Sequence, residues 1–176
     1  MNTKNYLTPT KKYKSLISAT HSVYRLVNST YELKDLISRM SRMMCQIFNA
    51  QCCLIELLDH TKEYSLIKCL VSDRNKYIID KRLKVTDRIQ KNIIRKASSI
   101  RKGNLLGIPL ICEDIIGVII LKRNRPEKEF DIFDQEMLMA IAEQAITGIK
   151  NLQLYEEQQK ILLGSIKSLV TLLDTR

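Results

Sequence analysis

The chain has 176 residues, of which 45% are hydrophobic and 27% are charged. This length suits one domain with a hydrophobic core and some additional helix, because single domains commonly contain roughly 100 to 200 residues. The sequence has no run of about 18 apolar residues, and its polar opening lacks the apolar segment of a signal peptide. We therefore expect a cytoplasmic protein that does not span a membrane.

The net charge of +10 is concentrated in one segment. Residues 74–102 contain eleven Lys or Arg and two Asp, a net charge of +9, which leaves +1 for the rest of the chain. Such a segment predicts an electropositive surface.

Two helices are predicted near the start of the chain. Residues 1–12 form a polar tail, and a first helix over 13–28 is indicated by apolar residues at spacings of three and four. The same spacing between Leu33 and Ile47 predicts a second helix, whose methionines we assign to the core. Ser29 and Glu32 have the spacing of a capping box at its start.

The middle of the chain has the pattern of strands. Two apolar runs, 51–59 and 63–71, are joined by a turn at His60 and Thr61, which predicts an antiparallel hairpin, and a weaker strand is predicted at 77–85. Thr86 and Asp87 can cap a short helix that ends near Ala97. "LLGIPLI" and "IIGVIILKR" are then two further strands, so the order of elements predicts an α+β fold.

The second half of the sequence carries four motifs in a fixed order: a Pro-containing strand, an "IGV" strand, an F-x-x-x-D opening and a helix with the pattern A-x-Q…I-x-N-x-x-L-Y-E. Their residues are Pro109, Gly117, Phe130, Asp134, Ala142, Gln144, Ile149, Asn151, Leu154 and Tyr155. In these residues and their order, the sequence resembles a GAF domain. The resemblance implies a GAF-like domain over 29–157: a central antiparallel sheet flanked by helices, with the first and last helices packed together on one face. It also implies a sensory or dimerising role, by analogy alone.

The last helix carries one apolar stripe. From Leu138 the stripe advances by alternating threes and fours through Ile141, Ala145, Gly148, Leu152, Tyr155, Gln159, Leu162, Ile166, Leu169 and Leu173. An average spacing of 3.5 residues over five heptads is typical of a coiled coil. We expect residues 138 to about 152 to pack on their own domain, and the stripe beyond Tyr155 to need a second copy of the chain. The expected dimer contacts are Leu152, Tyr155, Leu162, Ile166, Leu169 and Leu173, and the first helix can join them in a four-helix bundle.

The end of the chain suggests an effector. "SIKSLVTLLDTR" resembles the helix that leads into HD-GYP phosphodiesterases, which cleave cyclic di-GMP. This resemblance implies that residues 158–176 are a signalling helix, and that the chain is the regulatory fragment of a larger enzyme. A histidine kinase or a diguanylate cyclase is an alternative effector. A constitutive dimerisation module without a ligand is an alternative role.

No catalytic centre is expected within the fragment. His21 and His60 lie in unrelated elements, and neither a P-loop nor a Rossmann glycine pattern occurs. The cysteines lack the spacing of a disulfide framework or a zinc site, so we expect buried structural thiols at Cys45, Cys52, Cys53, Cys69 and Cys112. We assign no catalytic residue, no metal site and no cofactor.

A small ligand or a nucleic acid is a further possibility for the basic segment. If a ligand binds, the charge favours an anion or nucleotide at Arg74, Lys76, Arg82 and Lys84. However, "SSIRKGN" is short where ligand-binding relatives insert a longer lid, which counts against a ligand. Tyr77 is the one aromatic residue in the segment, which counts against nucleic acid.

One ion pair is predicted at the start of the last helix. "NRPEKEFDIFDQ" departs from the signature of GAF domains that bind cyclic nucleotides, since arginine replaces lysine and glutamine replaces the last acid. We expect Arg125 and Asp134 to form a structural ion pair between the last strand and the last helix.

Overall fold

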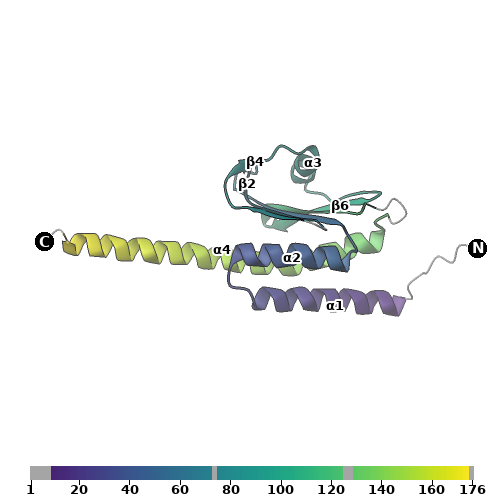
Figure 1. The fold of residues 1–176 in the computed structure, drawn as a ribbon, viewed down its shortest axis with the longest axis horizontal. Coiled ribbons are helices and arrows are strands. Elements are labelled where there is room, and N and C mark those ends of the chain that lie inside the picture. The colour runs from purple at the N-terminus through teal and green to yellow at the C-terminus, as the bar shows by residue number, and fades with distance from the viewer. Residues whose placement is uncertain (1–8, 73–74, 125–128, 175–176) are drawn as a thin grey trace, which may run out of the picture.

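The computed structural model describes residues 9–72, 75–124 and 129–174. Two helices precede the first strands, a short helix interrupts the sheet, and one long helix ends the chain (Figure 1). The helices are α1 (Pro9–Asn28), α2 (Leu33–Ile47), α3 (Arg88–Lys96) and α4 (Ile132–Asp174). The strands are β1 (Cys52–Leu58), β2 (Tyr64–Ser72), β3 (Lys76–Ile79), β4 (Leu83–Lys84), β5 (Ile100–Lys102), β6 (Leu105–Cys112) and β7 (Asp114–Lys122).

The seven strands form one antiparallel sheet with the order β3-β2-β1-β7-β6-β5, and β4 also pairs with β2. The predicted hairpin of β1 and β2 is confirmed, and the two further predicted strands are β6 and β7, which pair with each other. Successive side chains of a strand point to opposite faces, and Cys53, Ile55 and Leu57 of β1 accordingly enter the main core. The α+β fold with an antiparallel sheet and flanking helices is confirmed.

The helices are unequally divided between the two faces of the sheet. In Figure 1, α2 and α4 lie along one face, α1 lies beyond them, and α3 lies on the opposite face. Met40 and Met44 of α2 are fully buried in the main core, as the methionine stripe predicted. Leu138 and Ile141 of α4 are fully buried in the same core. The first and last helices therefore pack on the same side of the sheet.

The start of α2 differs from the prediction. The capping box is wrong: the Ser29 hydroxyl donates to the Leu26 carbonyl at 3.2 Å, and the Glu32 side chain makes no capping bond. The Leu33 amide instead donates to Oε1 of Glu156, on α4, at 3.2 Å. An acceptor 123 residues away replaces the local one, which sequence spacing does not reveal. The cap of α3 is confirmed, since Asp87 accepts from the amides of Ile89 and Gln90 at 2.8 and 3.0 Å.

Other boundaries differ more modestly. The helix predicted from residue 13 begins at Pro9, and the strand predicted at 77–85 is divided into β3 and β4. The segment "SSIRKGN", expected to be a connection, contains the short edge strand β5. Short, exposed edge strands carry a weak hydrophobic signal, which is why the pattern did not indicate β5.

Candidate functional site

The helix α4 is one continuous element of 43 residues with two different halves. In the first half, the stripe residues Leu138, Ile141 and Ala145 are fully buried against the domain, as is Ile149 beside the stripe. At Gly148 an added Cβ atom would lie 2.8 Å from Cγ2 of Val27 and closer still to its Cγ1, so α1 meets α4 in close contact there. This half is therefore docked on its own domain.

The second half of α4 extends beyond the rest of the fold (Figure 1). Leu152 is half-buried, Tyr155 is 52% exposed, and no stripe residue after them is buried. The exposed fractions are 62% for Leu162, 48% for Ile166, 61% for Leu169 and 74% for Leu173. Ile161, Leu163, Val170 and Leu172 widen this apolar surface. We call the surface formed by Tyr155, Leu162, Ile166, Leu169 and Leu173 the α4 seam.

The outer side of α1 is also apolar. Tyr13, Ile17 and Tyr24 are more than half exposed, and their spacings of four and seven residues place them on one side of the helix. The exposed surfaces of α1 and α4 are both available to a partner.

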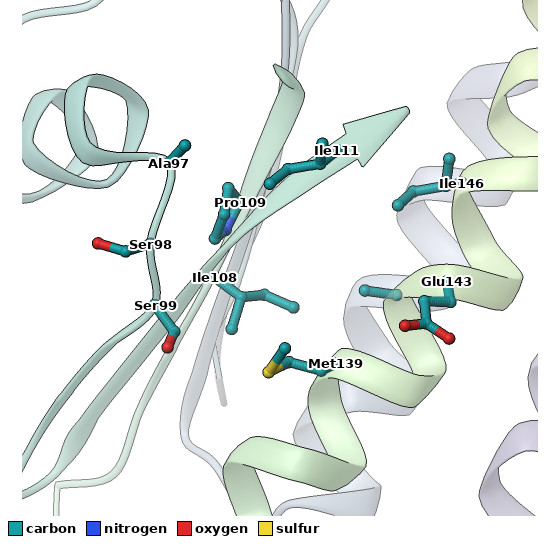
Figure 2. Close-up of a pocket in the computed structure, with 10 residues that line it drawn as sticks. Ala97, Ser98, Ser99, Ile108, Pro109, Ile111, Met139, Glu143 and Ile146 are labelled. Atoms are coloured by element: carbon teal, nitrogen blue, oxygen red, sulfur yellow. The ribbon is translucent and has the colours of Figure 1, made fainter. Parts of the chain in front are cut away.

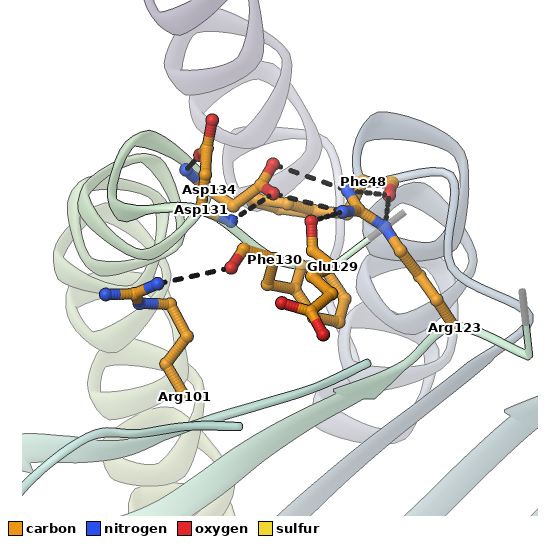
Figure 3. A network of polar contacts seen from close by, with 7 residues as sticks. All are labelled: Phe48, Arg101, Arg123, Glu129, Phe130, Asp131 and Asp134. Carbon is orange, nitrogen blue, oxygen red and sulfur yellow. Dashed lines mark hydrogen bonds and ion pairs between the residues drawn. The ribbon is translucent and has the colours of Figure 1, made fainter. Parts of the chain in front are cut away.

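A buried guanidinium connects three elements at the start of α4 (Figure 3). Arg123 follows β7 and is 9% exposed. Its Nε and Nη2 donate to the Phe48 carbonyl at 3.0 and 2.7 Å, and its Nη1 donates to the Glu129 carbonyl at 3.1 Å. The guanidinium also pairs with Asp134 at 3.1 Å and stacks over the Phe130 ring at 4.0 Å from its centroid. The end of α2, the end of β7 and the first turn of α4 therefore share one cation.

The partner of Asp134 was not found from the sequence. Arg125 lies outside the described residues, and the partner that the structure shows is Arg123. Strand alternation could have identified it, because Arg123 has the same parity as Leu121, which faces the helices. Asp134 also caps its own helix, since the Asp131 amide donates to it at 3.1 Å.

Of the described candidate anion-binding residues, Lys76 lies apart from Arg82 and Lys84, which are both beside Tyr64. Lys76 is opposite Val71, and Lys84 is opposite Tyr64, at the other end of β2. Seven residues of strand separate those positions by roughly 20 Å. Arg82 pairs with Asp59 at 3.0 Å and stacks over Tyr64. Arg74 lies outside the described residues.

The turn between β1 and β2 is organised by Asp59. Its carboxylate accepts from the Thr61 hydroxyl at 2.6 Å, and this bond, with the Tyr64 amide and Arg82, lowers the pKa of Asp59 below its ordinary value. Arg82 thus has a structural partner at the hairpin.

A polar cluster lies buried on the α3 side of the sheet. Glu56 of β1, Ser65 of β2 and Gln90 of α3 are each at most 3% exposed. Oε2 of Glu56, Oγ of Ser65 and Oε1 of Gln90 have no hydrogen-bond partner among the described residues. Burial raises the pKa of Glu56, against the effect of Lys68, whose Nζ is 3.7 Å away. Nothing in the sequence pattern marked these residues.

Two of the pockets that border α4 lie along its middle part, between residues 139 and 160. One, of about 370 Å³, is lined by Ile108 and Pro109 of β6, by Ser99, and by Met139 and Glu143 of α4 (Figure 2). The other, of about 820 Å³, lies where α4 leaves the domain and is lined by Leu33, Leu57, His60, Leu66, Ile67, Asp80, Lys81, Arg82, Lys150, Gln153, Leu154, Glu156, Glu157 and Lys160. A molecule in either pocket would contact the long helix directly.

In the part of the chain that the structure describes, no three residues of the types His, Cys, Asp and Glu are grouped so that they could hold a metal ion. None of the helices within the described ranges is both long and apolar enough to cross a membrane.

Comparison with known proteins gives a match in structure but not in sequence. No protein-family model matches the chain, and no curated protein matches it. The GAF domain of an Acinetobacter phosphoenolpyruvate-protein phosphotransferase matches with a TM-score of 0.65 and 15% identity, over 81% of this chain and 97% of that one. The chain has the GAF fold.

Two further neighbours show the range of proteins with this GAF fold. The GAF domain of a phosphoenolpyruvate-protein phosphotransferase from Coxiella burnetii matches with a TM-score of 0.66 and 12% identity, over 82% of this chain and 98% of that one. Free methionine-R-sulfoxide reductase from Neisseria meningitidis matches with a TM-score of 0.65 and 12% identity, over 81% and 93%. Because one of these neighbours is itself an enzyme, the fold alone does not decide whether this chain catalyses a reaction.

Proposed function

We propose that this chain is a non-catalytic regulatory GAF domain that forms a homodimer through α1 and the α4 seam. In this proposal α4 relays the state of the domain to an effector domain that follows it in the same protein, in the cytoplasm. The observation that carries the proposal is that one apolar stripe runs through α4, buried as far as Ile149 and exposed after Tyr155.

A second copy of the chain is the partner that fits the seam. The seam has the heptad spacing of a coiled coil, and two parallel copies of α4 would place identical seams against each other. A lone helix of this length gains little stability in water from its backbone alone, because helices in proteins are held mainly by packing of an apolar face. Pairing removes the seam leucines from water, and each Å² of apolar surface buried in this way stabilises the dimer by about 25 cal/mol.

The docked half of α4 is positioned to sense the domain. Arg123 connects the first turn of α4 to β7 and to the end of α2, and Glu156 receives the Leu33 amide from the start of α2. A shift of α2 or of the sheet would therefore act on α4 at both ends of its docked half. Small shifts of packed helices are a known way to move such an output between two states.

Similar folds support an effector in the same chain. The Acinetobacter and Coxiella neighbours are GAF domains from larger phosphotransferases. We propose an HD-GYP phosphodiesterase as the effector because of the resemblance of residues 165–176 to its lead-in helix. A histidine kinase or a diguanylate cyclase is the alternative. Sequencing the codons that follow Arg176 tests this part: a His-Asp pair soon afterwards supports the phosphodiesterase, and a kinase or cyclase pattern contradicts it.

A dimer without a ligand is the second candidate. Close packing of α3 on the sheet favours this candidate, because it leaves little room for a ligand between them. A Cβ atom at Gly107 of β6 would lie 2.6 Å from Cδ1 of Ile93 of α3. Titration with cyclic nucleotides while thermal unfolding is followed separates the two, because a ligand that binds the folded state must raise the unfolding temperature. No rise with any nucleotide would favour the ligand-free dimer.

Binding of nucleic acid is the candidate from another class. Each described cation of residues 76–102 is exposed, including Arg88, Lys91 and Arg95 of α3. Filter binding to DNA at low and high salt tests it, since phosphate contacts weaken steeply as salt rises. Lack of binding at low salt would exclude this function.

Hydrogen exchange along α4 tests the main proposal. We expect amides of residues 138–152 to be protected at all protein concentrations, and amides of 155–173 to be protected only where the dimer forms. L162D/L169D places two carboxylates in the seam and should remove protection from 155–173 alone. S168D/T171D, which places two carboxylates on the other side of the helix, should retain it. Protection of 155–173 in the seam variant would contradict the proposal.

A further inference from the structure

Three thiols gather between α2 and the sheet. Cys45 lies in the last part of α2, and Cys53 of β1 and Cys69 of β2 are fully buried beneath it in the main core. Cys45 and Ser41 both influence the pKa of the Cys53 thiol, and Ser41 and Cys45 also influence that of Cys69, so these side chains are neighbours. The prediction of buried thiols holds for Cys53 and Cys69 and is wrong for Cys45, which is half-buried.

Cys45 connects this buried cluster to the surface. It is half-buried and lines a pocket of about 390 Å³ beside the end of β2, whose wall includes Arg42 of α2 and Lys76 of β3. Cationic neighbours favour the thiolate form of a cysteine, which is the form that reacts.

The two thiols beneath Cys45 have a different character. Burial raises the pKa of Cys53 well above its ordinary value, and burial likewise raises the pKa of Cys69. Both are therefore held as neutral thiols, shielded from the outside. A buried thiol beside a more accessible one is the arrangement in which one sulfur meets an oxidant and the other completes a disulfide.

We propose that Cys45 is a modification site that reacts with hydroperoxides in the Arg42 and Lys76 pocket, and that Cys53 then closes a disulfide between α2 and β1. In the first step the Cys45 thiolate attacks the outer peroxide oxygen, the O–O bond breaks, and Cys45 becomes a sulfenic acid while the peroxide leaves as an alkoxide or hydroxide that takes up a proton. In the second step the Cys53 sulfur attacks the Cys45 sulfur, the S–O bond breaks, and water leaves with the Cys53 proton.

The disulfide would fix α2 against the sheet. The other end of α2 donates the Leu33 amide to Glu156, at the point where α4 leaves the domain. If the dimer relay proposed above is correct, oxidation at one end of α2 therefore acts on α4 at the other end. The chemistry of the thiol pair itself does not depend on that relay.

Mass spectrometry of the whole chain treated with hydrogen peroxide tests the proposal. We expect a loss of two hydrogen masses, a peptide map that joins Cys45 to Cys53, and reversal by a thiol reductant. C45S should abolish the Cys45–Cys53 link. C53A should leave a sulfenic acid at Cys45, which dimedone would label, and this readout remains valid if C53A lowers stability.

Two other half-buried cysteines serve as matched controls. C52S and C112S remove thiols outside the cluster and should leave the Cys45–Cys53 link unchanged. The proposal is overturned if peroxide leaves Cys45 and Cys53 reduced, or if Cys52 or Cys112 is oxidised while Cys45 is not. Light scattering on the same samples reports the dimer separately, so failure of the thiol reaction and failure of the relay are distinguishable.

Discussion

At the scale of single residues, the features that hold α4 to the domain are polar and buried. Arg123 satisfies two backbone carbonyls and one carboxylate from three elements (Figure 3). A buried polar group left without its partner costs more free energy than the bond itself contributes, because it has also lost water. Arg123 is therefore expected to contribute more to the free energy of unfolding than the exposed arginines do.

Replacing Arg123 tests this expectation. R123M should lower the free energy of unfolding by about 3 kcal/mol, because it leaves Asp134 and the Phe48 carbonyl partly buried without their partner. R101M is the matched control, since exposed Arg101 makes single bonds to Gln135 and the Phe130 carbonyl, and it should cost less than about 1 kcal/mol. Urea denaturation measures both, and equal losses would contradict the assigned role of Arg123.

Glu56 gives a prediction about pH. Burial raises the pKa of Glu56 in the folded state. The folded chain therefore binds a proton at Glu56 more tightly than the unfolded chain does. Its contribution to stability is therefore fully present below the ordinary carboxyl pKa and is lost as pH rises through the raised pKa. E56Q keeps the shape without the charge, so it should match the wild type in acid and become the more stable protein as pH rises. Urea denaturation from pH 4 to 8 measures this, and a difference independent of pH would contradict it.

At the scale of elements, α4 combines two environments in one helix. The apolar stripe predicted that the first half packs on the domain and that the stripe beyond Tyr155 does not. This could be predicted because the period of apolar residues is a property of the sequence alone. The hairpin and the Asp87 cap were predictable for the same reason. The contacts of Arg123 with Phe48 and of Glu156 with Leu33 were not, since they join residues 75 and 123 positions apart. The Glu56, Ser65 and Gln90 cluster likewise appears only when β1, β2 and α3 are assembled.

The two glycines of α4 allow a matched test of these environments. G148A should lower the free energy of unfolding by about 1 to 3 kcal/mol, because its methyl group would overlap Val27 of α1. V27A should restore part of this loss in the double variant. At Gly164 an added Cβ atom meets nothing within 4 Å, so G164A should be neutral or favour the helix by up to about 1 kcal/mol. Equal effects at the two positions in urea denaturation would contradict the docking of α1 on the first half alone.

At the scale of the whole molecule, the fold leaves the second half of α4 without a cover in the described part of the chain. The GAF fold buries the sheet and the first half of α4, and the seam that remains has the spacing of a two-stranded coil. The dimer, the relay and the effector proposals all depend on a second copy meeting this seam.

Sedimentation equilibrium across a wide dilution range tests that dependence most directly. One chain has a mass of 20.4 kDa. The account predicts twice that mass at high concentration, with L162D/L169D returning the mass of one chain. A wild-type mass of 20.4 kDa at every concentration would contradict the account.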